Sequence, residues 1–308
     1  MVTPYVAAYS TSYAHRVPYL TVAEYQNDPN GIASNVLVAG QGAGVNQQVL
    51  EQTIVRASAW ADSLTQQALQ ATSDVQSGEY RMRDGWVYQS FDYAPIVYLT
   101  QVLWGWLPSQ LVALPDLSNV WPESRRVLRI PILAYTSSSQ ATPQVPLWPA
   151  AQYGRVLVQS TYVNGWANTL LAGAVSASAT SLTVTDPTGI VPGLPMYLVD
   201  AGQGGAGGGS ESFVVDASYT IGSATVPLKS GTSLAYAHQP GIPVSSLPQD
   251  VRQAVSSLTT ALIKTRAADA LVMASVSEEP SKSDLIEAGG ITDLEVAIDL
   301  LEPYRRVW

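Results

Sequence analysis

Apolar residues recur at helical spacing in two long segments of the chain. Between residues 45 and 71, positions 50, 54, 57, 61, 64 and 68 follow one another at intervals of four and three and are all Leu, Ile or Ala, which places them on one helical face. Val251, Val255, Leu258 and Leu262 repeat this spacing after Leu247-Pro248, and the first turn of a helix tolerates proline. The pattern predicts helices over about 45–71 and 247–274.

A shorter amphipathic pattern lies near the end of the chain. A helix is predicted from Thr292 to Leu301, with Leu294, Ile298 and Leu301 on one face, and it ends before Pro303. The polar segment 277–290 before it, which contains two adjacent glycines, is predicted to be a link.

The first 43 residues are rich in Tyr, Pro, Gly and Asn and are predicted to form an arm. One local helical signal lies within it, because Thr21 and Glu24 have the spacing of a capping box with Thr21 as the N-cap.

From about residue 79 to 162 the pattern changes to strands and loops. The stretch 79–91 predicts a hairpin, because Asp84-Gly85 stands between two alternating runs and suits a type I′ turn. Strands are also predicted at 127–133 and 155–162. Pro131 favours an edge position for the former, because proline has no N–H to donate to a neighbour. The Ser-, Thr- and Pro-rich segment 136–149 is predicted to be a surface loop.

Short strands with turn signals between them follow in 173–245 and predict a small all-β barrel or sandwich. Because helical segments lie on both sides of it, this unit is predicted to be an insertion whose two ends lie close together. The expected fold class is α+β, with a helical core, a hairpin and strand region, and the inserted β unit. The expected divisions are an arm 1–43, a core 44–172, the insertion 173–245, a core helix 246–276, and a link, short helix and tail 277–308.

The composition favours a protein that is covered by partners. Hydrophobic residues make up 46% of the 308 residues and charged residues only 13%, about half the usual charged share of a soluble domain. Trp and Tyr number 8 and 16 against 2 Phe, and aromatic residues with a polar edge suit interfaces. For any single Trp, ordinary core filling is at least as good an explanation.

The net charge is −9, and the sequence contains no evident basic stripe interleaved with aromatic residues. Tight binding of nucleic acid through its phosphates is therefore not expected. There is no cysteine, which excludes disulfides and thiolate metal sites. Neither a signal peptide nor a membrane span is expected.

No motif with catalytic, cofactor or metal chemistry is recognised, so catalytic residues, cofactors and metal ligands are all predicted to be none. The two histidines, His15 and His238, lie in different segments and are each interpreted as polar loop residues. The run Gly202–Gly209 lacks the Gly-Lys-Ser/Thr ending of a phosphate-binding loop and is interpreted as a flexible loop.

Several short motifs, in this order, resemble head–tail connector (adaptor) proteins of long-tailed phages, particularly phages of actinobacteria. The motifs are Ala57-Ser-Ala-Trp60-Ala-Asp62, Arg83-Asp-Gly85, Thr161-Tyr-Val-Asn-Gly165-Trp166, Leu247-Pro-Gln-Asp-Val251 and the ending 293–307. In simpler members of the family, the strand that ends in Tyr-x-x-Gly leads directly to the Leu-Pro helix. Here 173–245 stands between them, and its own pattern resembles small β modules of phage tail and neck proteins.

The resemblance implies a non-enzymatic subunit in the neck of the virion, made in the host cytoplasm. It implies a ring of about twelve copies beneath the portal protein. This ring would also contact a neck stopper or tail protein and would let double-stranded DNA pass without specific binding. No membrane partner is implied.

Two sets of residues follow as hypotheses. Packing of the two long helices, with repetition around the ring, is assigned to Leu50, Ile54, Trp60, Leu64, Val251, Val255, Leu258 and Leu262. Docking to the portal is assigned to the C-terminal helix and tail, through Leu294, Ile298, Leu301, Pro303, Tyr304, Arg305, Arg306 and Trp308. Removal of everything after Gly290 is expected to leave a folded subunit that no longer binds the portal.

Two alternatives remain open. The chain could be another neck protein, such as a stopper, a completion protein or a tail terminator. From a different class, it could be a carbohydrate-binding or hydrolytic tail protein, although the β unit contains only Tyr197, Phe213, Tyr219 and Tyr236 as aromatic residues.

Overall fold

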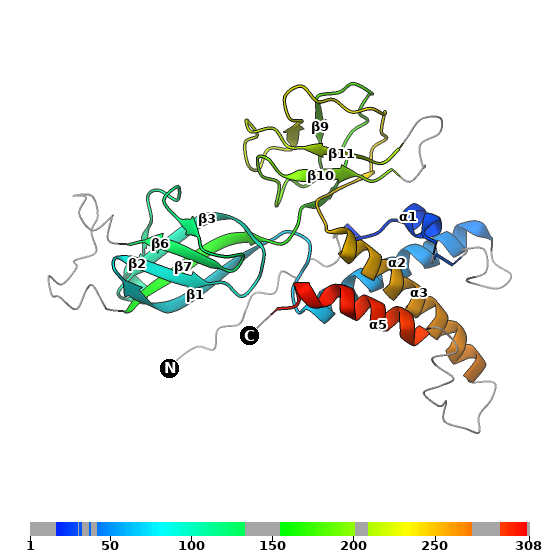
Figure 1. Ribbon diagram of the computed structural model, residues 1–308, viewed down its shortest axis with the longest axis horizontal. Helices are drawn as coiled ribbons and strands as arrows, with labels where there is room; N and C mark the ends of the chain where they lie inside the picture. Colours follow the sequence, from blue (N-terminus) through cyan, green and yellow to red (C-terminus); the bar gives the residue numbers. More distant parts are fainter. Residues whose placement is uncertain are drawn as a thin grey trace.

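The computed structural model describes residues 17–29, 31, 32, 37, 42–132, 155–200, 209–272 and 290–306, with the backbone alone for 265–272 and 290–292. The chain is a mixed α+β protein with three parts, which we name the helical unit, the sheet unit and the small β unit (Figure 1). Each part is built around its own cluster of buried apolar side chains.

The sheet unit is a curled antiparallel sheet of seven strands. In spatial order they are β4 (Val112–Ala113), β3 (Ile96–Gly105), β7 (Arg155–Asn164), β1 (Thr72–Arg83), β2 (Trp86–Ser90), β6 (Val127–Pro131) and β5 (Trp121–Pro122). A 3-10 turn, η3 (Pro108–Gln110), precedes β4. Side chains alternate between the two faces, and the inner face buries Met82, Val87, Ile130, Val156 and Val158.

The predicted hairpin is confirmed. β1 and β2 pair with Arg83 opposite Trp86, and Asp84 and Gly85 between them have φ of 49° and 83°. Positive φ at both central residues is the geometry of a type I′ turn, and Asp-Gly is well suited to it.

The edge position predicted for β6 was wrong, because β6 is the second strand from the edge and β5 is the edge strand. The two-residue strand β5 pairs with Leu128 and Arg129 and covers that side of β6. Pro131 lies at the end of β6 beyond this contact, opposite Trp86 of β2, where its missing N–H removes no bond to β5.

The first long helix ends earlier than predicted. Helix α2 runs from Ala43 to Thr65, so Ala68 is outside it, and strand β1 has begun by Thr72. Gln66 adopts a left-handed conformation with φ of 56°, and its N–H bonds to the carbonyls of Asp62 and Ser63. A non-glycine residue at such a C-cap is uncommon, so the sequence carries no obvious stop signal there.

The small β unit contains β8 (Asn168–Leu170), β9 (Ser181–Thr183), β10 (Pro195–Leu198), β11 (Glu211–Val214), β12 (Thr225–Pro227) and β13 (Pro243–Ser245). One sheet has the order β11-β10-β13-β8, and β12 pairs with β9 in a second. Strands β8 and β13, where the chain enters and leaves the unit, are antiparallel partners, with Asn168 opposite Ser245.

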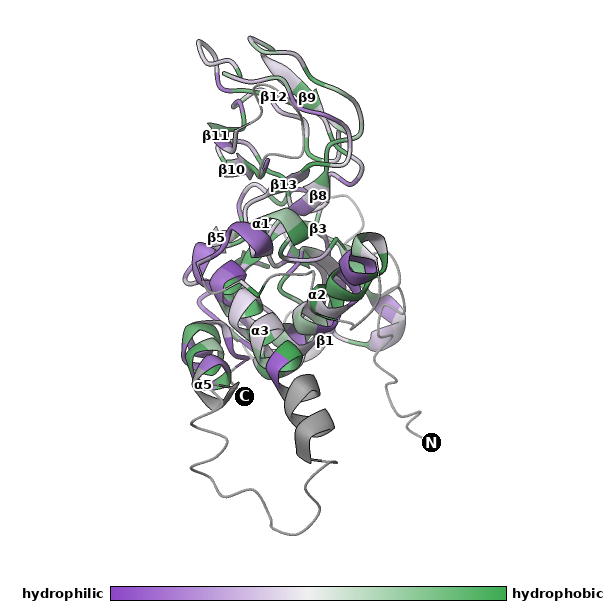
Figure 2. Cartoon of the chain, turned by 90° about the vertical axis from the view of Figure 1, so that its right-hand side faces the viewer, coloured by the Kyte–Doolittle hydropathy of each residue, from purple (hydrophilic) through white to green (hydrophobic). Residues whose placement is uncertain are grey.

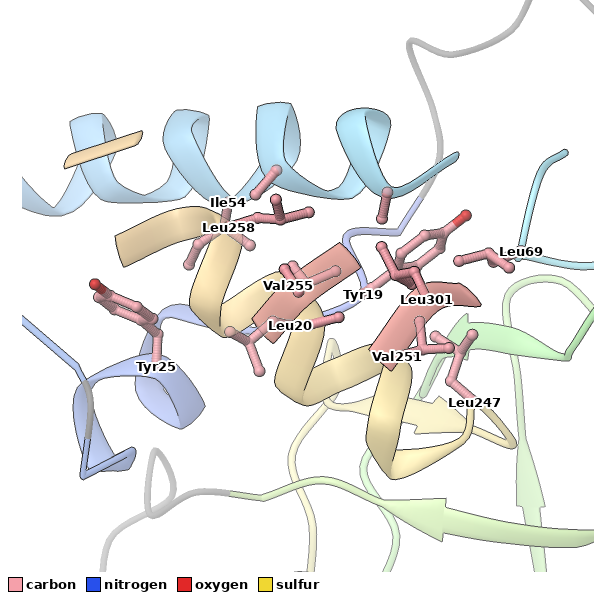
Figure 3. Packing of buried hydrophobic residues seen from close by; sticks show 14 of the residues in the cluster. Tyr19, Leu20, Tyr25, Ile54, Leu69, Leu247, Val251, Val255, Leu258 and Leu301 are labelled. Carbon is pink, nitrogen blue, oxygen red and sulfur yellow. The ribbon is translucent and has the colours of Figure 1, made fainter. Parts of the chain in front are cut away.

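The helical unit consists of α1 (Val22–Asn27), α2, α3 (Gln249–Val272) and α5 (Gly290–Leu301), followed by the 3-10 turn η6 (Glu302–Tyr304). Helix α3 packs against both α2 and α5, and the side chains between them form one apolar core (Figure 3). Hydrophobic and hydrophilic stretches alternate along these helices, as expected when one face is buried (Figure 2).

The N-terminal segment also belongs to this core. The capping box of Thr21 and Glu24 at the start of α1 is confirmed, and Tyr19, Leu20 and Tyr25 are buried against the helices (Figure 3). Residues 17–29 of the predicted arm therefore pack against the helices, and their apolar side chains complete the core.

Within the described part of the chain, no helix combines the length and the apolarity that a membrane crossing requires. The predicted loops at 136–149 and 202–208 and the link at 277–289 lie outside the described residues.

Candidate interaction surfaces

The residues assigned to ring packing lie inside the helical unit of a single chain. Leu50, Ile54, Val251, Val255 and Leu258 are fully or almost fully buried in its core, and Trp60, Leu64 and Leu262 pack against that core while partly exposed. The two long helices therefore pack on each other, as predicted. Repetition of this packing around a ring stays a prediction, and it would use the outward faces of the helices.

Helix α5 buries part of its predicted apolar face inside its own chain. Ala297 and Leu301 are buried and Leu294 is partly buried, all against α3 and its neighbours. Ile298 is 41% exposed and Val296 48% exposed. Leu294 and Leu301 of the face assigned to docking therefore pack within the chain itself, and only Ile298 of that face is exposed. Ala297, a small residue that permits close approach to α3, occupies the centre of the contact.

The tail after α5 is held between the helical unit and the sheet unit. The ring of Tyr304 lies edge-on to the indole of Trp166, with ring centroids 5.3 Å apart. The backbone carbonyl of Tyr304 accepts a 2.7 Å hydrogen bond from Nε2 of Gln67. Burial, followed by the charge of Asp250, raises the pKa of Tyr304.

Arg306 extends these contacts to the sheet unit. Its backbone N–H donates to the carbonyl of Thr65, and its guanidinium lies 3.1 Å from Asp92 and 4.8 Å from the ring centre of Tyr93. Pro303 lies in η6, Arg305 forms a long ion pair with Glu302 at 3.9 Å, and Trp308 lies outside the described residues.

These contacts revise the expected effect of removing everything after Gly290. Because Leu301 is only 2% exposed and Ala297 is fully buried in the shared core, that truncation uncovers α3 and destabilises the subunit. A truncation after Glu302 removes the tail and keeps the buried residues of α5.

A buried hydrogen-bond network fixes the end of α2. The hydroxyl of Tyr19 donates to Oδ1 of Asp62 at 2.6 Å and accepts from the N–H of Gln70 at 3.0 Å. Oδ1 of Asp62 also accepts from the N–H of Leu69, and the N–H of Tyr19 donates to Ser58. A second anchor is the ion pair of Arg252 with Glu24, the acid of the capping box.

His238, interpreted from the sequence as a polar loop residue, is buried in the small β unit. It is 1% exposed, and its ring lies between two carboxylates, with Nδ1 3.1 Å from Asp200 and Nε2 2.7 Å from Glu211. Glu211 also accepts from the backbone N–H groups of Ala235 and Tyr236. The cluster ties the loop around His238 to strand β11.

The outer face of the sheet unit gathers arginine and aromatic residues from separate segments. In the β-pairing, Trp121 and Tyr88 both lie opposite Arg129, Arg83 lies opposite Trp86, and Arg81 lies opposite Arg155. Register partners and residues two apart on a strand share one face. We call this set (Arg81, Arg83, Trp86, Tyr88, Trp121, Arg129 and Arg155) the arginine–aromatic face.

This face is open to solvent over much of its area. Arg81, Arg83 and Arg155 are exposed, and the indole of Trp121 is 66% exposed. Arg129 stacks on Trp86 at 3.8 Å from the ring centre and pairs with Glu123 at 3.6 Å. The sequence does not reveal this grouping, because it forms only when β5, β6, β2, β1 and β7 are placed side by side.

Among the residues that the structure describes, no cluster of three His, Cys, Asp or Glu side chains could hold a metal ion. The His238 cluster joins one imidazole to two carboxylates by hydrogen bonds.

No protein-family model matches the chain, and no curated protein matches its sequence. A solved structure described as "Neck of empty GTA particle computed with C6 symmetry" contains a chain that aligns with it. The alignment covers 98% of this chain and 95% of that chain, at 12% sequence identity and a TM-score of 0.37. A likeness of this degree does not establish a common fold or function.

Proposed function

We propose that the chain is a structural subunit of the neck of a tailed phage, a head–tail connector that assembles into a ring beneath the portal. The observation that carries this proposal is that two of the motifs with the family resemblance, Thr161–Trp166 and Leu247–Val251, occupy joints between the parts of the fold.

The first joint is at Gly165, in the Thr161–Trp166 motif. Its φ is +88°, and a Cβ there would lie 2.8 Å from the carbonyl oxygen of Gln70, so glycine is required. The N–H of the adjacent Trp166 donates to the carbonyl of Leu69, and the N–H of Ala71 donates to the carbonyl of Trp166. This motif therefore connects the end of β7 to the segment between α2 and β1.

The second joint is Leu247-Pro248, which leads from β13 into α3. The carbonyl of Pro248 accepts hydrogen bonds from the backbone N–H groups of Val251 and Arg252, and these are the first hydrogen bonds of the helix. Since β8 and β13 pair at the base of the small β unit, the chain returns from this unit close to where it left. A short link from the strand motif to the helix motif would preserve the remaining architecture, which agrees with the simpler pattern of the family.

The exposed side chains suit an assembly. Trp121, Tyr88 and the arginines beside them are the residue types that most often anchor protein interfaces, and the chain as a whole has few charges. A ring arises when one surface of a subunit contacts a different surface of the next and the rotation closes.

For contact with the portal, we favour the tail over helix α5. Ala297 and Leu301 are buried in the core, whereas Arg305 of the tail is exposed and Tyr304 and Arg306 are partly exposed. A chain truncated after Glu302 is expected to fold and to lose portal binding in a pull-down with portal protein from the same virion. Unchanged binding would remove the tail from the proposal.

The excess of acidic residues suits a channel through which DNA slides without adhering. Electron microscopy of intact virions, with this chain labelled and located along the particle axis, tests the function. A position beneath the portal supports it, and absence of the chain from the neck overturns it.

A further inference from the structure

We propose that the arginine–aromatic face of one copy binds the outward face of helix α5 in a neighbouring copy, head to tail. The inference deepens the proposed function and rests on it, since it names the contact that would build the ring.

The first observation is an unfavourable arrangement of charges on the sheet. Arg81 and Arg155 are direct cross-strand partners, and Arg83 follows two residues after Arg81 on the same face. Like charges placed opposite each other destabilise a sheet. Among the ion pairs of the described residues, Arg155 pairs with Glu79 at 3.6 Å, while none involves Arg81 or Arg83. An acidic partner would turn this repulsion into attraction.

The second observation is the complementary surface on α5. Glu295 and Asp299 of α5 and Glu302 at the start of η6 are exposed. Their spacing of four and three places them on one side of the helix and its end, opposite the buried Ala297 and Leu301. The exposed Val296 and Ile298 flank this row on its two sides. We call these five residues the acidic face of α5.

The two faces match in chemistry. Carboxylates of the acidic face can accept paired hydrogen bonds from the guanidinium groups, while Val296 and Ile298 can pack against Tyr88 and Trp121. Between Thr72 and Asn164 the sequence has equal numbers of basic and acidic residues, so the acidic excess lies in the rest of the chain. The sheet unit as a whole is thus neutral, and its arginine–aromatic face is the basic surface in a contact between copies.

The two faces lie on different units of the chain. Arg83 lies at the far end of β1 from Thr72, where the sheet joins the helical unit, and a strand of that length spans roughly 35 Å. Figure 1 shows the sheet unit on one side of the molecule and the helical unit, which contains α5, on the other. Two different surfaces give a heterologous contact, the kind that forms rings.

The test is a charge-reversal exchange in the full-length chain. Arg81→Glu with Arg83→Glu reverses the sheet, and Glu295→Lys with Asp299→Lys reverses the helix. Each pair alone is expected to weaken self-association at least about tenfold, measured by sedimentation and light scattering at low salt. Mixing the two variants, or combining all four changes in one chain, is expected to restore association, because opposite charges again face each other.

Three further measurements complete the test. Lys229→Glu changes an exposed charge on the small β unit and serves as the control that leaves association unchanged. Trp121→Ala is expected to weaken association while leaving thermal unfolding unaltered, because its indole is mostly exposed. Circular dichroism of every variant verifies that the subunit still folds.

Association that is insensitive to both reversals, or that is not restored by combining them, overturns the inference. So does a wild-type chain that stays monomeric at every concentration and salt tested. Binding of duplex DNA that is lost on reversal of Arg81 and Arg83, with self-association unchanged, would assign the face to phosphates instead. Location of the chain in the neck is independent of these results, so the proposed function and this contact fail separately.

Discussion

The phenol of Tyr19 and the carboxylate of Asp62 form a 2.6 Å hydrogen bond across 43 residues of sequence. The hydroxyl of Tyr19 also accepts a hydrogen bond from the N–H of Gln70, and the carboxylate of Asp62 accepts one from the N–H of Leu69. Both donors lie in the segment that follows α2. The N-terminal segment therefore determines how the chain turns from the helical unit into the sheet unit.

Tyr19→Phe is expected to lower the free energy of unfolding by about 1–3 kcal/mol, because it leaves the N–H of Gln70 and a lone pair of Asp62 buried without their partner. Urea denaturation followed by circular dichroism measures the change. Tyr88→Phe, which alters an exposed hydroxyl on the sheet, is the matched control and should leave stability unchanged. Equal stability of the Tyr19 variant and the wild type would show that the network contributes nothing.

His238→Ala is expected to destabilise the small β unit by about 3–5 kcal/mol, because it leaves Asp200 and Glu211 facing each other across a cavity without the imidazole between them. His238→Gln retains an amide donor and should recover part of the loss. Hydrogen exchange of the backbone amides in β10 and β11 reports on this unit separately from the others. Unchanged exchange in the alanine variant would contradict the prediction.

Tyr304→Ala is expected to loosen the tail and to lower stability by about 1 kcal/mol, through loss of the edge-on contact with Trp166. Tyr304→Phe keeps the ring and removes only the long 3.4 Å hydrogen bond to Asp250, so it should behave as the wild type. Limited proteolysis with a protease that cleaves after arginine, at Arg305 and Arg306, measures the loosening. Equal cleavage rates of the alanine variant and the wild type would show that this contact does not hold the tail.

Stability is expected to fall in alkaline solution. Burial raises the pKa of Tyr162, with a further contribution from Asp74, and burial raises that of Tyr25. The unfolded chain therefore releases these protons at a lower pH than the folded chain does. The stability is fully present below the unfolded pKa of 10.0 and is lost as pH rises above it toward the raised folded values.

Each such tyrosine contributes a slope of up to about 1.4 kcal/mol per pH unit. Thermal unfolding between about pH 8 and pH 12 measures this slope. Tyr162→Phe keeps the edge-on contact with Phe91 and removes one titrating group, so its alkaline decline should be shallower. An identical pH dependence in this variant would exclude Tyr162 as a contributor.

Local signals made part of the fold predictable from the sequence. The capping box of Thr21, the Asp84-Gly85 turn and the Leu247-Pro248 helix start each depend on neighbouring residues, and each is present in the structure. The end of α2 was missed because a tertiary network, and not a glycine, stabilises the left-handed Gln66.

The surfaces could not be predicted in the same way. Trp121, Tyr88, Arg81 and Arg155 are separated by up to 74 residues in the sequence, and only strand order brings them onto one face. The burial of His238 likewise depends on two carboxylates from distant strands and loops. The helical period of 3.6 residues places Ile298 on the same face as Leu294 and Leu301. In the structure Ile298 is exposed, because the small Ala297 occupies the contact with α3 instead.

Because Asn168 and Ser245 are neighbours across one pair of strands, the intervening chain can change in length or content while its points of departure and return remain fixed. The position is thus suited to exchange of whole modules. Related chains could acquire, lose or replace a decoration there while the path from β7 to α3 stays the same, and a foreign domain whose termini lie close together could be grafted at the same place.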